Sequence, residues 1–308
     1  MSRDMISGVL NIDKPRGMTS HDVVAVTRQR VGIRAVGHTG TLDPDASGVL
    51  VLCLGRATKF ARFFEALDKT FWAVMKLGIC TDTQDATGVV TRQVPVGDIS
   101  AAQLHRTLPQ FTGMIQQTPP MYSAVRLKGK RLYQLARKGQ TVEREPRTVT
   151  IRRLELLDLQ NDLATLSVTC SKGTYIRTLC EDLGHALGCG AHMVHLQRCR
   201  VGPFNLRQAH SLDELRHQAD TGTLEPRPQP LDEALAFLPA VTISPQEHQG
   251  LRNGQGRALS SVLSRMLPVS ITASSYRLCT PADTTVAVMH RQTAKPEKWK
   301  VYQLDKER

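Results

Sequence analysis

Residues 37–48 read "GHTGTLDPDASG", and the apolar run "VLVLCLG" follows directly at residues 49–55. Glycine-rich loops of this kind often hold phosphate groups through their backbone N–H groups. This loop has no lysine to complete such a site, and it places the carboxylate of Asp43 near its centre. The question is therefore which chemistry uses an aspartate in a tightly turned loop that leads into a buried strand.

The loop residues alone leave three interpretations open. A phosphate-binding P-loop needs the pattern GxxxxGK[ST], which this loop does not match. An aspartyl phosphotransferase resembles "DPDAS", but it would need a metal ion and an apolar strand before its first aspartate, and here the apolar run comes after. A purely structural turn is the third interpretation, because Asp-Pro-Asp is typical of turns.

Arg177 offers a partner for the loop carboxylate. It falls in the first turn of a helix predicted from "TYIRTLCEDLGHALG" at residues 174–188. A cation there opposes the helix dipole by about 0.3–1 kcal/mol, and a buried carboxylate would offset this cost. Asp43 is a candidate for that carboxylate, and the pair would keep Asp43 ionised and oriented. An unpaired surface cation is the alternative. A second polar turn, "GICTDTQDATG" at residues 78–88, carries Asp82 and Asp85.

The overall charge indicates a polyanionic partner. The chain has 308 residues, a formal net charge of +12 and a pI of about 9.6. We expect nucleic acid rather than membrane, because no apolar run approaches the roughly 20 residues of a membrane span. The seven cysteines form no CxxC pair, so we expect reduced thiols, no metal site and a cytoplasmic location. The N-terminal residues have no signal-peptide pattern.

Strands and helices do not alternate regularly along the chain, which favours an α+β fold with a mixed, mainly antiparallel sheet. A proline-rich connector, "PRPQP", marks the best domain boundary. We therefore predict a catalytic domain over residues 1–220, a linker over 221–239 and a small domain over 240–308. The apolar runs of the last segment predict a small β-barrel or an appended β-domain.

Two basic stretches are candidates for RNA or phosphate binding. Residues 126–153 contain ten Lys or Arg and two acids, with tyrosines nearby, a combination that suits RNA phosphates and stacked bases. A solvated basic helix face is the alternative. Near the N-terminus, Pro15 follows Lys14 and fixes the local backbone. Lys14 and Arg16 could thus hold a phosphate or pack against a neighbouring loop.

Five stretches together resemble one family. They are, in chain order, "GVLNIDKPRGMTS", "GHTGTLDPDASGVL", "LGICTDTQDATG", "PPMYSAVRLKGKRLYQLARKG" and "CSKGTYIRTLCEDLGHALGCGAHMVHLQR". Their order and spacing are similar to those of the bacterial tRNA pseudouridine-55 synthases, the TruB family. The resemblance is close over residues 8–215 and looser beyond, where "LRNGQ" at 251–255 resembles the start of a PUA-like RNA-binding domain. It implies a pseudouridine-synthase fold: the mixed sheet flanked by helices, a basic insert at 126–147 and a PUA-like barrel.

The resemblance implies a cofactor-free isomerase that converts one uridine in the T arm of tRNA into pseudouridine. Asp43 matches the family nucleophile, which attacks either carbon 6 of uracil or carbon 1′ of ribose, and Arg177 matches the arginine paired with it. The glycines would let a nucleotide approach the loop closely. A uridine inside a folded T loop must be flipped out to react. His38 matches the residue that fills the vacated space.

The resemblance also implies several contacts with substrate. Tyr175 matches a pocket residue that touches uracil or acts on its carbon 5 proton, and Leu196 matches one that packs on the base. Asp85 matches an aspartate near the histidine loop, and Lys14 is a candidate substrate contact. The insert would clamp the T arm through its cations, for which the candidates are Arg126, Lys128, Lys130, Arg131, Arg137 and Lys138.

One position departs from the family pattern. The family has a tyrosine under the uracil where this chain has Phe71. Phenylalanine keeps the stacking face without the hydroxyl, and we predict that stacking suffices while Tyr175 or water handles the proton. Trp72 points to the other face of the strand, where we expect it in the core.

Other functional classes remain as alternatives. One is a tRNA-binding folding factor with little catalysis, which would not need Asp43. Another is a guide-RNA-dependent enzyme with accessory proteins, against which the insert argues. We expect a monomer with no obligate protein partner.

Overall fold

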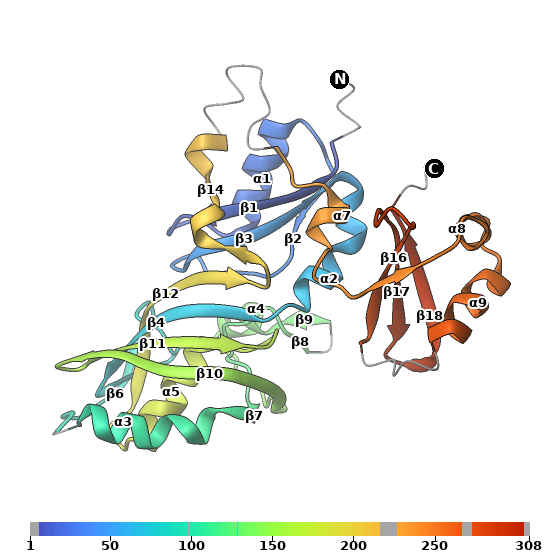
Figure 1. Ribbon diagram of the computed structural model, residues 1–308. Helices are drawn as coiled ribbons and strands as arrows, with labels where there is room; N and C mark the ends of the chain where they lie inside the picture. The colour runs from blue at the N-terminus through green and yellow to red at the C-terminus, as the bar shows by residue number, and fades with distance from the viewer. Residues whose placement is uncertain (1–5, 98, 128, 216–226, 267–272, 305–308) are drawn as a thin grey trace.

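The computed structural model describes residues 6–97, 99–127, 129–215, 227–266 and 273–304. The larger part is built on one mixed, mainly antiparallel sheet of ten strands (Figure 1). Eight of them run in the order β14-β1-β3-β12-β4-β11-β10-β7, with β2 paired to β3 and β13 to β12. Only the β1–β14 and β3–β12 pairs are parallel. The predicted α+β class with a mainly antiparallel sheet is confirmed.

The strands of this sheet differ in length. Their bounds are β1 (Gly8–Lys14), β2 (Val36–His38), β3 (Ser47–Leu54), β4 (Lys69–Leu77), β7 (Gly113–Gln117), β10 (Arg147–Gln160), β11 (Leu163–Cys170), β12 (Ala191–Val201), β13 (Phe204–Asn205) and β14 (His210–Ser211). Two small hairpins lie outside it: β5 (Ile79–Thr81) with β6 (Val90–Gln93), and β8 (Arg126–Leu127) with β9 (Lys130–Arg131).

The apolar run after the glycine loop forms β3, which is buried on both faces. Val49, Val51 and Cys53 pack into one hydrophobic cluster, whereas Leu50, Leu52 and Leu54 pack into another. This division follows from the two-residue period of a strand, and it explains why the run is continuous rather than alternating. The loop at residues 37–48 is therefore anchored to the best-buried strand of the sheet.

Helices cover the sheet. The helical segments of this part are α1 (Ser20–Val31), η2 (Gly55–Phe60), α2 (Ala61–Glu65), α3 (Ala101–Thr107), η3 (Leu108–Phe111), α4 (Leu132–Ala136), α5 (Ile176–Ala186), η4 (Leu206–Gln208) and α7 (Leu231–Ala234). Helix α1 begins with a capping box between Thr19 and Asp22 and ends at Gly32, which adopts a left-handed conformation. Helix α5 packs on β12 and β4, and Figure 1 shows it with α3 beside the lower half of the sheet.

The C-terminal part is a separate sheet of four strands with two helices (Figure 1). Its elements are β15 (Ala240–Thr242), α8 (Pro245–Arg252), α9 (Gly256–Met266), β16 (Ser275–Cys279), β17 (Thr285–Gln292) and β18 (Lys295–Gln303). The predicted barrel is not formed among the described residues, because β15 and β18 are the edges of an open sheet. The reason is that residues 245–266 form two helices, and these cover one face of the sheet.

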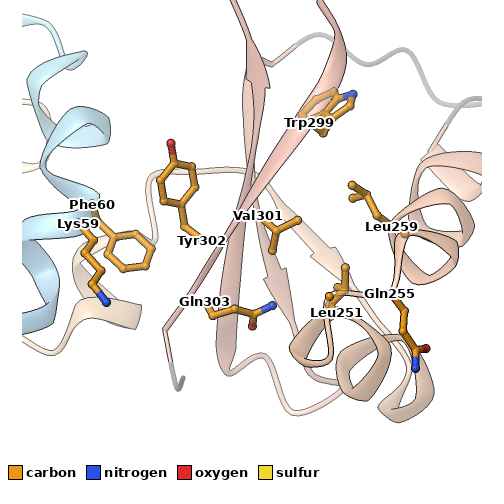
Figure 2. A pocket seen from close by; sticks show the side chains of 11 residues that line it. Lys59, Phe60, Leu251, Gln255, Leu259, Trp299, Val301, Tyr302 and Gln303 are labelled. Carbon is orange, nitrogen blue, oxygen red and sulfur yellow. The ribbon is translucent and has the colours of Figure 1, made fainter. Parts of the chain in front are cut away.

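The C-terminal sheet packs against η2 and α2. Arg62 donates a hydrogen bond from Nη1 to the Tyr302 hydroxyl at 2.7 Å, and the Phe63 and Tyr302 rings meet edge to face. Residues from both parts line a cavity of about 450 Å³, which Figure 2 shows around β18. None of the candidate site residues lines it. The predicted domain bounds stay a prediction. Gln229, in the described part of the predicted linker, forms a β-bridge with Val9 of β1, so this part of the linker lies against the large sheet.

Candidate active site

The loop at residues 37–48 joins β2 to β3 and presents Asp43 at its tip. The Ser20 hydroxyl, at the start of α1, accepts a hydrogen bond from Leu42 N at 2.8 Å and donates to Leu42 O at 3.1 Å. The loop also closes on itself, since Ala46 N donates to Asp43 O at 3.1 Å. These bonds fix the backbone on both sides of the Asp43 carboxylate.

Asp43 and Arg177 form the ion pair that the helix-dipole argument predicted. The Arg177 Nε lies 3.0 Å from Asp43 Oδ2, and Arg177 occupies the first turn of α5 as expected. The arginine side chain is only 6 % exposed, whereas that of Asp43 is 41 % exposed. The guanidinium is therefore held in the interior, whereas the Asp43 carboxylate remains accessible to a reactant.

Asp85 is a second carboxylate on the same guanidinium. Its Oδ2 accepts from Arg177 Nη1 at 3.3 Å, while its Oδ1 accepts from the hydroxyl of Thr83 and from the backbone and hydroxyl of Thr87. The remaining donors of Arg177 reach Thr83 O at 3.1 Å and Tyr122 O at 2.9 Å. Arg177 therefore ties together three loops that lie far apart in the sequence.

The electrostatics of Asp43 are divided. Loss of water contact raises its pKa above the usual range, Arg177 lowers it, Asp85 raises it, and Lys14 lowers it. Arg177 and Lys14 favour the ionised form, as expected of the pair, but burial and Asp85 outweigh them, and the pKa of Asp43 is raised overall. A carboxylate whose ionisation depends on oriented neighbours is typical of a functional site.

Lys14 is buried behind the Asp43 loop, and its ammonium bonds backbone carbonyls rather than facing a ligand. It is completely buried, and its Nζ donates to the carbonyls of Pro15, Met18 and Pro44 at 2.8, 2.6 and 3.1 Å. Burial lowers its pKa to about 8. Of its two predicted roles, packing against a neighbouring loop is the one that this geometry shows, because all three protons of the ammonium are used.

Arg198 on β12 is a support that the sequence reading missed. It is buried, and it donates to Val49 O at 2.7 Å, Gly40 O at 3.0 Å and Thr41 O at 3.4 Å. Burial lowers its pKa to about 9. The backbone of Arg198 also lies directly against Gly48, where an added Cβ would come within 2.3 Å of Arg198 O. The glycine is required there by this close approach.

Three predicted substrate contacts lie around the Asp43 loop. Phe71 on β4 and Leu196 on β12 are both buried, and they belong to the same hydrophobic cluster as Leu42. Tyr175 is half-buried at the N-cap of α5, two residues before Arg177, and burial raises its pKa. Phe71 pairs with Arg198 across the sheet, and Arg198 donates to Gly40 O and Thr41 O of the Asp43 loop. Asp43 and Arg177 both influence the pKa of Tyr175, which places the phenol near the ion pair. Trp72, expected in the core, is instead 52 % exposed, because the opposite face of β4 is open there.

His38 and the basic insert are at the margins of this site. His38 lies at the end of β2, where its Nδ1 accepts from Gly40 N at 3.3 Å, and burial lowers its pKa, which favours the neutral ring. The insert forms the β8–β9 hairpin and α4, and five of the six candidate RNA contacts lie among its described residues and are exposed, namely Arg126, Lys130, Arg131, Arg137 and Lys138. Lys128 lies outside the described residues.

Within the described part of the chain, no cluster of His, Cys, Asp or Glu side chains is suited to hold a metal ion. The same residues contain no helix that is long and apolar enough to cross a membrane.

Family models and curated relatives match most of this chain. The family model for the TruB family pseudouridylate synthase (N terminal domain) matches residues 28–176, and that for the tRNA pseudouridylate synthase B C-terminal domain matches residues 177–236. A tRNA pseudouridine synthase B of Stutzerimonas stutzeri is 49 % identical over 78 % of this chain and 79 % of its own length. That of Geobacillus thermodenitrificans is 42 % identical over 94 % of this chain and 97 % of its own.

The fold has solved relatives. A crystal structure of a Cbf5-Nop10-Gar1 complex matches 98 % of this chain and 84 % of that chain, with a TM-score of 0.70 and 27 % identity. A structure of an H/ACA RNP bound to a substrate RNA containing 2′-deoxyuridine matches with a TM-score of 0.67 and 25 % identity. The family models, the curated relatives and the fold define an RNA pseudouridine synthase, which is an isomerase. Among these enzymes, the chain belongs to the TruB family.

Proposed function

We propose that this protein isomerises the uridine at position 55 in the T arm of tRNA, with Asp43 as the nucleophile. The observation that carries the proposal is the carboxylate held 3.0 Å from a buried guanidinium beside an apolar floor. The names of its relatives support tRNA as the substrate. The family resemblance of the Asp43 loop and of the basic insert supports the position within the T arm.

In the proposed reaction, the target uridine leaves its stack and lies over Phe71 and Leu196, with Tyr175 at the edge of uracil. The Asp43 carboxylate attacks carbon 6 of uracil or carbon 1′ of ribose, and the glycosidic bond breaks. The detached uracil turns, and its carbon 5 bonds to carbon 1′. The carbon 5 proton then leaves to water, either directly or to the Tyr175 hydroxyl as that hydroxyl passes its own proton to water. Nitrogen 1 of uracil, which has lost its bond to ribose, takes up a proton from water, and the Asp43 carboxylate is restored. Only rearrangement and proton exchange with water occur, so no cofactor is needed.

Binding uses other residues in this proposal. The cations of the insert hold the phosphates of the T arm, and His38 fills the space that the flipped uridine vacates. We propose that the PUA-like part adds RNA contacts and that the enzyme acts alone as a cytoplasmic monomer. The solved Cbf5 relatives are in complexes with Nop10 and Gar1, so co-purification with a protein partner would count against solitary action.

Tritium release tests the reaction, because the carbon 5 hydrogen leaves only when pseudouridine forms. The assay uses a tRNA transcript with tritium at carbon 5 of uridine, without added metal or nucleotide. We expect release by the unaltered protein and none by Asp43→Asn. Asp45→Asn, a change at an exposed aspartate in the same loop, is the matched control and should keep its rate within about threefold, as surface changes usually do.

Two outcomes would lead to other conclusions. A transcript with cytidine at position 55 should release nothing, and release from it would refute the proposed position. If the unaltered protein binds tRNA and releases no tritium, the tRNA-binding folding factor becomes the better account.

A further inference from the structure

Gln117 is a buried polar residue that the reaction scheme does not use. It is the last residue of β7, the edge strand of the large sheet, and it is 2 % exposed. Its side chain lies on the same face as Ile115, which packs against the core. Gln116 points the other way, is exposed, and donates to the Thr148 hydroxyl at 2.9 Å. A buried amide at a strand end needs partners, and these identify its role.

Both ends of the Gln117 amide are bound to the backbone of Tyr175. Its Nε2 donates to Tyr175 O at 3.0 Å, and its Oε1 accepts from Tyr175 N at 2.7 Å. The side chain therefore pairs with a single residue as a neighbouring strand would. Tyr175 is the N-cap of α5, and its own side chain makes no capping bond. Gln117 supplies from another element the bond to the N-cap backbone N–H that the N3 side chain of a capping box would give.

The residue held in this way carries two parts of the site. Tyr175 is the proposed uracil contact, and Arg177, two residues further along, pairs with Asp43. The loop that follows Gln117 also returns to this point, because Tyr122 O accepts from Arg177 Nη2 at 2.9 Å. The end of β7 thus fixes the first turn of α5 through its backbone and through its arginine.

We propose that Gln117 is a positioning residue for catalysis, which sets Tyr175 and Arg177 relative to Asp43 without touching the substrate. This inference rests on the proposed function. A displacement of about 1 Å in a catalytic group can cost on the order of 100-fold in rate. Loss of the clamp should therefore slow the chemical step, whereas the exposed cations that bind RNA stay in place.

The test compares Gln117→Met with Gln116→Met in single-turnover tritium release with enzyme in excess over tRNA. Methionine fills the buried volume but can make neither bond to Tyr175. We expect the rate constant of the Gln117 variant to fall about 10- to 100-fold and its tRNA dissociation constant to stay within about threefold. The control, the same substitution one residue away on the exposed face, should stay within about threefold in both quantities.

The single-turnover rate constant separates positioning from folding. Because enzyme is in excess, a variant that merely folds less well needs more total protein to saturate the tRNA but reaches the same limiting rate constant, whereas a misplaced site lowers the limiting rate constant itself. Gln117→Asn, which keeps an amide but withdraws it by one methylene, should show the same loss if the methionine variant does not fold.

A rate constant within about threefold of the unaltered protein for a folded Gln117 variant would overturn the inference, and so would an equal fall in the Gln116 control. A loss confined to tRNA affinity would also overturn it, since Gln117 would then serve binding. If the unaltered protein itself releases no tritium, the proposed function fails first and the inference fails with it.

Discussion

Replacing Arg177 with methionine or lysine separates charge from geometry in the positioning of Asp43. The guanidinium contacts two carboxylates and two carbonyls, at 3.0 Å from Asp43, 3.3 Å from Asp85, 3.1 Å from Thr83 O and 2.9 Å from Tyr122 O. Methionine removes all four contacts and leaves the carboxylates unopposed. Lysine keeps the charge but carries a single ammonium, which cannot reproduce the planar, four-way arrangement.

The expected losses follow from these contacts. A hydrogen bond to a charged group contributes about 1.5–3 kcal/mol. We take the low end, about 1.5 kcal/mol, for the pair with Asp43, because solvent screens a side chain that is 41 % exposed. Asp85 is better buried, and its bond adds a further 1.5–3 kcal/mol or so. Since about 1.4 kcal/mol is tenfold in rate, Arg177→Met should lose roughly 100- to 1,000-fold. Arg177→Lys, which keeps a partner for Asp43, should lose roughly 10- to 100-fold.

The pH dependence of the rate tests the direction of the electrostatic effect of Arg177 on Asp43, whatever the size of the rate loss. In the proposed reaction Asp43 acts in its ionised form, so the rate should fall as the pH drops through the pKa of this group. Arg177 lowers that pKa, whereas burial and Asp85 raise it. Removing the guanidinium leaves burial and Asp85 opposed by Lys14 without Arg177, so the acid limb of the rate profile must move to higher pH. Raising the pH should therefore restore the methionine variant more than the unaltered protein, with the lysine variant between them.

Single-turnover tritium release across the pH range measures both effects. Arg152→Met is the matched control, because Arg152 forms an exposed pair with Asp68 at 3.2 Å and should contribute little. The reasoning would be refuted by a folded Arg177→Met enzyme that stays within fivefold of the unaltered rate. An unchanged acid limb in that variant would refute the electrostatic part alone.

Three further predictions concern other parts of the molecule. Phe71→Tyr should change the rate by less than about tenfold, and a gain above roughly 100-fold, the size expected of a general base, would show that the missing hydroxyl matters. In a urea titration, Gly48→Ala should lower the free energy of unfolding by more than about 2 kcal/mol, because the added Cβ would lie 2.3 Å from Arg198 O. Gly37→Ala is the control, because the space around Gly37 is open, and it should change the free energy of unfolding little. Alanine in place of Arg126, Lys130 and Arg131 together should weaken tRNA binding and reduce the salt dependence of the binding constant, and an unchanged salt slope would exclude these cations from the interface.

The sequence predicted the pairing of Asp43 with Arg177 because each residue sits where its charge is unfavourable without a partner. A carboxylate in a glycine loop and a cation at a helix N-terminus each need a partner, and each could be recognised from its neighbours alone. Tyr175 and Leu196 had no such signal and entered only through the family resemblance, since an aromatic or apolar residue next to a helix or strand is ordinarily part of the core.

Arg198 was missed for a different reason. Strand β12 contains register shifts between Met193 and His195 and between Arg198 and Arg200. Leu196 and Arg198 nevertheless lie two residues apart in the regular stretch between these shifts. Arginine is ordinarily exposed, so the residue type did not mark Arg198 as buried. For Trp72 the period was correct, but the sequence did not show that the second face of β4 is open to solvent.

In the C-terminal part, the sequence contained a helix-start pattern, but the apolar runs led to the prediction of a barrel instead. Ser244 and Glu247 form a capping box, and Pro245 occupies the first turn of α8. This pattern indicates a helix start, whereas the apolar runs that follow α9 led to the prediction of a barrel. Two helices in so short a segment leave too few residues for the strands of a closed barrel.

The cations beneath the Asp43 loop explain how so polar a loop is held rigidly. Lys14 and Arg198 direct their donors to backbone carbonyls on both sides of Asp43, and Arg177 binds its carboxylate. These cations are buried, so salt screens them far less than it screens the exposed cations of the insert. The chain therefore uses positive charge in two separate ways. Buried cations fix the proposed nucleophile, while exposed cations are the proposed RNA contacts, and the net charge of +12 reports only the sum of all charges.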